Sequence, residues 1–249
     1  MQDSMLKGKT ALITGASRGI GKGIAIKFAE QGAFVGINYN SDEKASNETL
    51  KTIKKNGGDG ILLKADVSQE KDVENMVKTL IEKRNAIDIL VNNAGIYKRN
   101  SFQNISTHDW EKSLSINLTG CYNVCQKVIP FMKSGSKIIF MSSQLAFKGS
   151  AHGADYATTK AGMLGLMRSL AAELADKKIN VNAVAPGTID TDLLTGYTEK
   201  MRKSRINEIP LKRLGTPGDI ANTCLFLASG LSDYITGETI HVNGGLYIH

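Results

Sequence analysis

The sequence is poor in several residue types and patterns that mark particular classes of protein. Its 249 residues include only three cysteines, Cys121, Cys125 and Cys224, and no histidine cluster joins them, so we expect buried thiols rather than disulfides or a metal site. No proline- or serine-rich linker divides the chain, which predicts one domain over residues 1–249. No apolar segment reaches the ~20 residues needed to cross a bilayer, and no signal peptide is recognisable. We therefore expect no membrane association and a soluble, cytoplasmic protein.

Aromatic residues are also scarce, at 6% of the chain, and they are not interleaved with basic residues. The 31 lysines and arginines exceed the 24 acidic residues and give a formal charge of +7, but they are spread along the chain without a basic arm. This pattern argues against a nucleic-acid partner. The mild positive charge suits an anionic cofactor and would steer an acidic partner such as a carrier protein.

Apolar strand-like runs alternate with helix-like runs along the whole sequence. The strand-like runs cover residues 9–14, 33–38, 60–64, 87–92, 137–142, 179–185 and 239–242. The helix-like runs cover residues 43–55, 71–84, 108–132, 156–176 and 217–228, and a further helical pattern begins at Ile20. This alternation predicts an α/β fold with a parallel seven-stranded sheet covered by helices on both faces.

A glycine-rich turn joins the first strand-like run to the helical pattern at Ile20. Its glycines follow Gly-x-x-x-Gly-x-Gly rather than the Gly-x-Gly-x-x-Gly of the standard dinucleotide fingerprint. A strand, a glycine turn and a helix start place backbone N–H groups where they meet a pyrophosphate, so we predict a doubly wound Rossmann fold. The predicted cofactor contacts in this turn are Gly15, Ser17, Arg18, Gly19, Ile20 and Gly21. The alternative is that these glycines only turn the chain.

The end of the second strand-like run predicts which dinucleotide binds. NAD sites usually place an acidic residue there to hold the ribose 2′-hydroxyl, whereas this chain has Asn38, Tyr39, Asn40 and Ser41. Arg18 supplies a guanidinium suited to a 2′-phosphate. We therefore predict NADP(H) rather than NAD(H); the alternative is that Arg18 is a solvated surface base.

Three residues indicate acid–base chemistry. Tyr156 and Lys160 are four residues apart in a helix-compatible run and therefore share a helix face, while Ser143 directly follows an apolar strand-like run. A free phenol titrates near ~10, and a fixed cation beside it favours the phenolate, so we expect Lys160 to lower the pKa of Tyr156. Ser142 should face the opposite way along the strand, which favours Ser143 as the partner of Tyr156.

Several short motifs occur in the order and at the intervals of one known family. They are Thr14-Gly15 with Gly19 and Gly21, Asn92-Asn93-Ala94-Gly95, Asn117, Ser143, Tyr156 with Lys160, and Pro186-Gly187. The chain resembles the single-domain short-chain dehydrogenases/reductases over nearly its whole length. Within that family it is most similar to the 3-oxoacyl-(acyl-carrier-protein) reductases, on the turn residues 14–21, the stretch 210–215 and the segments 235–239 and 242–245.

The resemblance implies roles for individual residues. Asn117, Ser143, Tyr156 and Lys160 would form the catalytic set, in which Tyr156 donates a proton, Ser143 holds the carbonyl oxygen and Asn117 holds a water that relays protons to Lys160. Lys160 would also bind the nicotinamide ribose, and Tyr156 would contact the cofactor too. The further implied cofactor contacts are Asp66, Val67, Asn93, Ala94, Gly95, Pro186, Gly187, Thr188, Ile189 and Thr191. The alternatives are a helix cap for Asp66, a core or capping role for Asn117, and turn chemistry for Thr188, Ile189 and Thr191.

The resemblance also implies an activity and an assembly. The chain would reduce a 3-oxoacyl thioester with NADPH in fatty acid synthesis, and it would form a homotetramer. The alternatives are a reductase of a small ketone, diketone or sugar, and a sensor that binds NADPH without chemistry. Residues 190–213 would form a mobile lid over the carbonyl site. The short segment 133–137 lacks bases that other family members place there, whereas Lys177 lies at a matching basic position, so docking of an acidic acyl carrier protein is left open.

Overall fold

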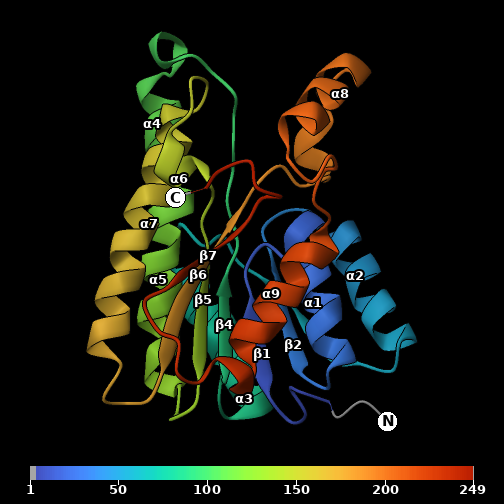
Figure 1. Ribbon diagram of the computed structural model, residues 1–249. Helices are drawn as coiled ribbons and strands as arrows, with labels where there is room; N and C mark the ends of the chain where they lie inside the picture. Colours follow the sequence, from blue (N-terminus) through green and yellow to red (C-terminus); the bar gives the residue numbers. More distant parts are fainter. Residues whose placement is uncertain (1–3, 249) are drawn as a thin grey trace.

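The structure is a computed structural model that describes residues 4–248, and a parallel seven-stranded sheet forms its centre (Figure 1). The strands are β1 (Thr10–Ile13), β2 (Phe34–Tyr39), β3 (Asp59–Lys64), β4 (Ile89–Asn92), β5 (Lys137–Met141), β6 (Asn180–Pro186) and β7 (Thr239–Val242). They lie in the order β3-β2-β1-β4-β5-β6-β7. The order therefore reverses between β1 and β4, and ligands of such sheets bind outside the carboxyl ends of the strands at this reversal.

The central strands are apolar on both faces because helices cover both sides of the sheet. Along β5, Ile138 and Phe140 belong to one buried cluster, whereas Ile139 and Met141 belong to the other. Successive side chains of a strand point to opposite faces, so a run of four buried apolar residues supplies both cores.

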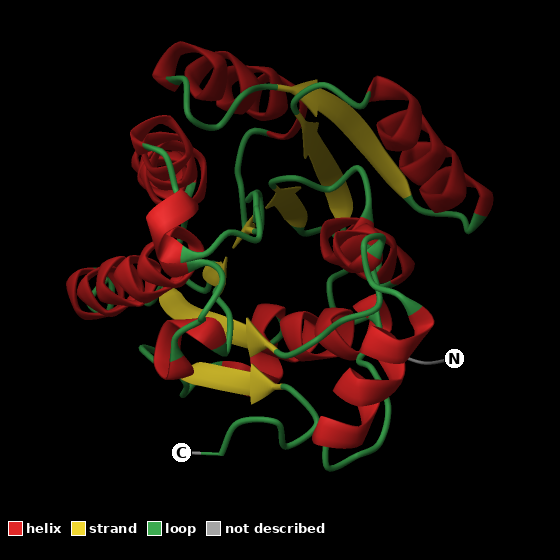
Figure 2. Cartoon of the chain, turned by 90° about the horizontal axis from the view of Figure 1, so that it is seen from above, coloured by secondary structure: helices red, strands yellow, loops and turns green. Residues whose placement is uncertain are grey.

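Two helical layers enclose the sheet (Figure 2). One layer contains α1 (Gly19–Glu30), α2 (Glu43–Lys55) and α9 (Pro217–Ala228); the other contains α3 (Glu70–Arg84), α4 (Thr107–Leu114), α5 (Gly120–Val128) and α7 (Ala154–Glu173). This arrangement confirms the predicted doubly wound α/β fold. The helices predicted over residues 43–55 and 217–228 have the expected bounds, and each predicted strand is found within two residues of its expected ends.

The helical segment predicted over residues 108–132 is confirmed, but it is not α-helical throughout. After α4 the helix continues as a π-helical segment, Ser115–Thr119, and after α5 it ends in a 3₁₀ turn, Ile129–Phe131. Asn117, inside the π segment, bonds the backbone of Ile96, and Pro130 lacks the N–H group that an α-helix would need. The chain is therefore helical from Thr107 to Phe131, with a π-helical part at Asn117 and a 3₁₀ end at Pro130.

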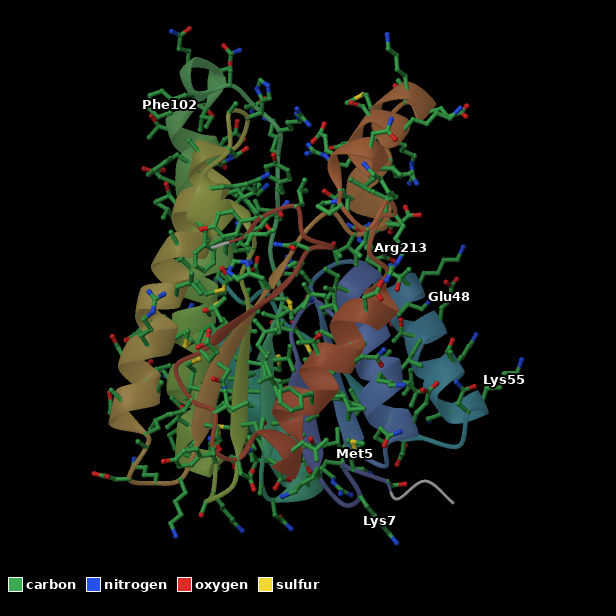
Figure 3. All side chains as sticks on the ribbon, viewed as in Figure 1. Met5, Lys7, Glu48, Lys55, Phe102 and Arg213 are labelled. Atoms are coloured by element: carbon green, nitrogen blue, oxygen red, sulfur yellow. The ribbon has the colours of Figure 1, made fainter. Side chains whose placement is uncertain are left out.

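Short elements lie at the carboxyl edge of the sheet, where the site was predicted. Helix α6 (Leu145–Lys148) follows β5, and α8 (Glu199–Glu208), which the sequence pattern did not predict, projects from the segment after β6 (Figure 1). The exposed Phe102 lies on the side of α4, and Arg213 lies near the start of α9 (Figure 3). Within residues 4–248, no helix is long and apolar enough to span a membrane, no group of three potential metal ligands gathers, and all three cysteines are buried and free.

Candidate active site

The glycine turn lies between β1 and α1 and adopts backbone conformations that glycine allows. Gly15 has φ +61° and Gly19 has φ +56°, values in the left-handed region. A Cβ atom on Gly15 would lie 2.9 Å from the Cα atom of Ala94, so the turn also packs against the segment after β4. Helix α1 begins at Gly19, which places the first N–H groups of the helix beside the turn.

Hydrogen bonds join this turn to the end of β4. The Thr14 hydroxyl accepts from the backbone N–H groups of Asn93 and Ala94 at 2.9 and 3.0 Å. The Asn93 amide donates to the carbonyl oxygens of Thr14 and Gly15 at 2.9 and 3.0 Å. The structure thus brings Asn93 and Ala94 to the glycine turn, and it gives Thr14, which was only part of a motif, a bracing role.

The end of β2 lies beside the same turn, but its side chains differ in what they face. Asn38 is buried; its Oδ1 atom accepts from the N–H of Gly15 at 3.1 Å, and its amide donates to the carbonyl oxygens of Leu63 and Ala65. Asn38 therefore supports the glycine turn by a hydrogen bond, and its side chain is buried rather than exposed at the site. Tyr39 is also buried, whereas the next two predicted residues, Asn40 and Ser41, are exposed.

The charges around this end agree with the predicted preference for NADP(H). Asp42, the first carboxylate after β2, caps α2 by accepting from the N–H of Ala45 at 3.0 Å. Arg18 is exposed and forms no ion pair with any residue in the range 4–248. The glycine turn thus offers an exposed guanidinium, and the end of β2 carries no carboxylate before Asp42.

Asp66 and Val67 follow β3 at the same edge. One Asp66 oxygen accepts from the backbone N–H and the hydroxyl of Ser68, and the other accepts from Asn40 at 3.3 Å. Val67 is buried against Gly120. The turn role of Asp66 is therefore visible, and the adenine contact predicted for this pair stays a prediction.

The segment after β6 also approaches the glycine turn. A Cβ atom on Gly19 would lie 3.6 Å from the Cγ2 atom of Thr191, so these two predicted residues are neighbours. Ile189 is buried and pairs with Gly215 in an isolated parallel bridge. Pro186 ends β6, and Gly187 packs closely against Asn243. The structure thus places Thr191 beside the turn, and Pro186, Gly187, Thr188 and Ile189 precede it in the same segment.

Tyr156, Ser143 and Lys160 lie close together. Ser143 follows β5, and its hydroxyl forms a side-chain hydrogen bond with Tyr156 on the first turn of α7. The Lys160 Nζ atom lies 5.5 Å from the centre of the Tyr156 ring and donates to the carbonyl oxygen of Met141 at 2.7 Å. Ser142 also reaches α7, because its hydroxyl donates to the carbonyl oxygen of Lys160 at 3.0 Å, and the orientation predicted for it, opposite to that of Ser143, stays a prediction.

The expected effect of Lys160 on the pKa of Tyr156 is wrong for this structure. Burial raises the pKa of Tyr156 to about 12, and the hydrogen bond from Ser143 only partly opposes that rise. Burial also lowers the pKa of Lys160 to about 8. Loss of hydration disfavours the charged form of each group, and this effect outweighs the attraction that the sequence suggested. Tyr156 is therefore a neutral hydroxyl at pH 7.

Asn117 lies within the π-helical segment and is fully buried. Its Oδ1 atom accepts from the N–H of Ile96 at 2.7 Å, and its amide donates to the Ile96 carbonyl oxygen and to the Thr159 hydroxyl. A Cβ atom on Gly95 would lie 3.2 Å from this Oδ1 atom and 3.6 Å from the Lys160 Nζ atom. Asn117 and Lys160 therefore border the same glycine, and the proton relay between them stays a prediction.

Tyr97 was missed by the sequence reasoning. Its ring lies against the ring of Tyr156, with the ring centres 4.7 Å apart. The available signal was an aromatic residue two positions after the Asn92–Gly95 motif, but nothing in the sequence shows which way such a side chain points.

Comparison with known proteins identifies the family. A family model described as enoyl-(acyl carrier protein) reductase matches residues 15–247. The 3-oxoacyl-[acyl-carrier-protein] reductase of Staphylococcus epidermidis is 42% identical over 96% of this chain and 99% of its own length. The enzyme of the same name from Aquifex aeolicus is 41% identical over 97% and 98%.

Solved structures have the same fold over nearly the whole chain. A dehydrogenase/reductase from Sinorhizobium meliloti has a TM-score of 0.94 at 29% identity and covers 99% of this chain and 98% of its own. A short-chain dehydrogenase from Burkholderia cenocepacia in complex with NADP has a TM-score of 0.92 at 30% identity and covers 97% and 99%. The chain belongs to the short-chain dehydrogenase/reductase family.

Proposed function

We propose that this chain is an NADP(H)-dependent oxidoreductase that reduces the 3-oxo group of a 3-oxoacyl thioester in fatty acid synthesis. The observation that carries this proposal is the 42% identity, over 96% of the chain, to a relative named 3-oxoacyl-[acyl-carrier-protein] reductase. The neighbouring Ser143, Tyr156 and Lys160 side chains supply the groups that carbonyl reduction needs.

The residues around the glycine turn fit a dinucleotide with a 2′-phosphate. Helix α1 begins at the left-handed Gly19, so its first backbone N–H groups have no partner within the helix, and a pyrophosphate is favoured there. Arg18 offers a guanidinium that forms no ion pair within residues 4–248, while the Asp42 carboxylate is engaged in capping α2. When bound, the nicotinamide supplies a hydride for the carbonyl carbon.

The catalytic side chains would then handle the proton and the oxygen. Tyr156 is protonated at pH 7, since its pKa is raised to about 12, so it is a proton donor to the alkoxide that forms during reduction. The Ser143 hydroxyl, which already bonds Tyr156, is placed to hold the same oxygen. Lys160, with a pKa lowered to about 8, is mostly an ammonium at pH 7 and would replace the proton through groups near Gly95.

A reductase of small ketones is the second candidate. A ketoreductase for an angucycline C-6 position, solved with bound NADP, has a TM-score of 0.92 at 31% identity. A sensor that binds NADPH without chemistry is a weaker candidate, because cofactor binding alone does not require Ser143 beside the Tyr156 hydroxyl.

One assay separates these candidates. NADPH oxidation is followed with acetoacetyl-CoA and with a panel of small ketones, diketones and sugars, and Tyr156→Phe serves as the control. The proposal predicts the highest kcat/KM with the thioester. A higher value with a small ketone would move the substrate assignment to the second candidate, and tight NADPH binding without any oxidation would favour the sensor.

The partner, the assembly and the location are further parts of the proposal. An acidic acyl carrier protein would use exposed bases such as Lys177, which lies beyond the C-terminal end of α7, at the opposite edge of the sheet from Tyr156 of the same chain, and would therefore serve the site of another copy in the assembly. A homotetramer would pair the helices around α4, α5 and α7, as the family resemblance implies. Mass photometry checks the assembly, and replacing Lys177 with Glu should raise the KM for a carrier-linked substrate but not for acetoacetyl-CoA. Cytoplasmic location stays a prediction.

A further inference from the structure

Tyr97 contacts the catalytic tyrosine and the segment that leads into its helix. The rings of Tyr97 and Tyr156 have centres 4.7 Å apart and planes inclined by 41°. The Tyr97 hydroxyl donates to the carbonyl oxygen of His152 at 2.9 Å, four residues before Tyr156. One side chain therefore holds both the phenol ring and the entry to α7.

Close packing at Gly153 fixes the place of the Tyr97 ring. A Cβ atom at Gly153 would lie 2.5 Å from the Cε2 atom of Tyr97 and 3.1 Å from its hydroxyl oxygen. Because Gly153 directly precedes α7, the ring fills space that any other residue at this position would occupy. The ring and the start of the helix are thus fitted to each other.

The backbone that carries Tyr97 is anchored in the protein interior. Its neighbour Ile96 is bonded through both N–H and C=O to the side chain of the buried Asn117, at 2.7 and 2.9 Å. On the other side, Lys98 pairs with Asp109 on α4 at 2.9 Å. Both sequence neighbours of Tyr97 are therefore bonded to other parts of the protein, which holds the Tyr97 ring in place against Tyr156.

From this packing we propose that Tyr97 is a positioning residue, whose ring holds the phenol of Tyr156 in the orientation that meets Ser143. The proton donor must lie within hydrogen-bond reach of the reacting oxygen, and a displacement of about 1 Å costs on the order of 100-fold in rate. Burial is the main cause of the raised pKa of Tyr156, and the neighbouring Tyr97 phenol raises it further, which agrees with close contact between the two rings. The activity arm of the test rests on the proposed function; a spectroscopic arm does not.

Three variants test the proposal. Tyr97→Leu removes the ring, Tyr97→Phe keeps the ring but removes the bond to His152, and Gly153→Ala displaces the ring without deleting it. Tyr234→Leu, at a fully exposed tyrosine between α9 and β7, is the matched control. With acetoacetyl-CoA and NADPH, we expect kcat to fall at least tenfold in Tyr97→Leu and Gly153→Ala, with the KM for NADPH within twofold of wild type.

The remaining variants separate positioning from a general loss of structure. Tyr97→Phe should keep kcat within threefold of wild type, and the double variant Tyr97→Leu/Gly153→Ala should be no slower than the slower single variant, because both changes act on one contact. Tyr234→Leu should match wild type. A kcat within twofold of wild type in Tyr97→Leu, or equal losses in Tyr97→Leu and Tyr97→Phe, would overturn the proposal.

A readout without substrate completes the test. In protein labelled with 3-fluorotyrosine, the ¹⁹F resonance of Tyr156 is assigned by its loss in Tyr156→Phe. We expect this resonance to move in Tyr97→Leu and to stay close to its wild-type position in Tyr97→Phe, because the neighbouring ring current is lost only in the former. An unmoved resonance in Tyr97→Leu would contradict the inference. If wild type fails to reduce the thioester while this resonance moves, the proposed function fails and the inference stands.

Discussion

Arg18 gives the sharpest test of cofactor preference, through the variant Arg18→Gln. Arg18 is the residue before α1; its side chain is exposed and makes no capping hydrogen bond to the helix. Removing the guanidinium therefore leaves no buried group unpaired within the protein. We expect the Tm of the variant to lie within about 1 °C of wild type, as is usual for surface changes of at most about 0.5 kcal/mol.

The expected loss in binding follows from the chemistry of the contact. A hydrogen bond to a charged group contributes about 1.5–3 kcal/mol, and exposure of Arg18 to water places it in the lower half of this range. About 1.5–2 kcal/mol corresponds to a loss of about tenfold to thirtyfold in affinity for NADPH. NADH lacks the 2′-phosphate, so its affinity should change by less than twofold.

Steady-state kinetics and fluorescence titration with both cofactors measure these effects. Arg168→Gln is the matched control, because Arg168 is also exposed but lies on α7. Arg18→Gln should weaken the binding of NADPH but not of NADH. Arg18→Glu should weaken NADPH binding further than Arg18→Gln does, and most strongly at low salt, because its charge repels the 2′-phosphate. Equal efficiency of wild type with NADH and NADPH, or unchanged NADPH binding in Arg18→Gln, would refute the assignment of the guanidinium to a 2′-phosphate.

Three other changes test the site and its support. Burial lowers the pKa of Lys160 from 10.5 to about 8, so between these pH values the unfolded chain binds more protons than the folded chain, and the free energy of unfolding rises with pH. In chemical denaturation, Lys160→Met should remove about 3 kcal/mol of that rise. Parallel plots of unfolding free energy against pH for the variant and wild type would contradict the assigned pKa. Gly15→Ala would place a Cβ atom 2.9 Å from Ala94 in a left-handed conformation, so isothermal titration should show at least tenfold weaker NADPH binding, and unchanged binding would argue against the turn as the cofactor site. Asn38→Ala leaves three backbone groups without partners and should cost about 2–4 kcal/mol in urea denaturation, whereas a cost below about 1 kcal/mol would show that Asn38 does not brace the turn.

The sequence predicted the fold well because its signals were local. Apolar runs such as Ile138–Met141 must be buried on both faces, and this requires a parallel sheet between helices. The helix over residues 108–132 was predicted without its π-helical part, where Asn117 bonds Ile96, 21 positions away in the sequence. Periodicity within one segment carries no information about such a contact.

The site was predicted in its members and less well in its electrostatics. Spacing correctly placed Tyr156 and Lys160 together, because residues four apart share a helix face. The direction of the pKa shift of Tyr156 depends on how much protein surrounds the phenol, including the ring of Tyr97, which only the folded chain reveals. Burial and long-range packing therefore set the chemistry that a motif alone leaves open.

The claim that Tyr156 donates the proton is tested most directly by single-turnover reduction of acetoacetyl-CoA in Tyr156→Phe, with NADPH binding measured on the same sample. Phenylalanine keeps the ring against Tyr97 and removes only the hydroxyl that bonds Ser143. We predict a rate lower by about 10²–10⁴-fold, the usual contribution of a general acid, with the NADPH Kd within twofold of wild type. A rate within threefold of wild type would contradict the account.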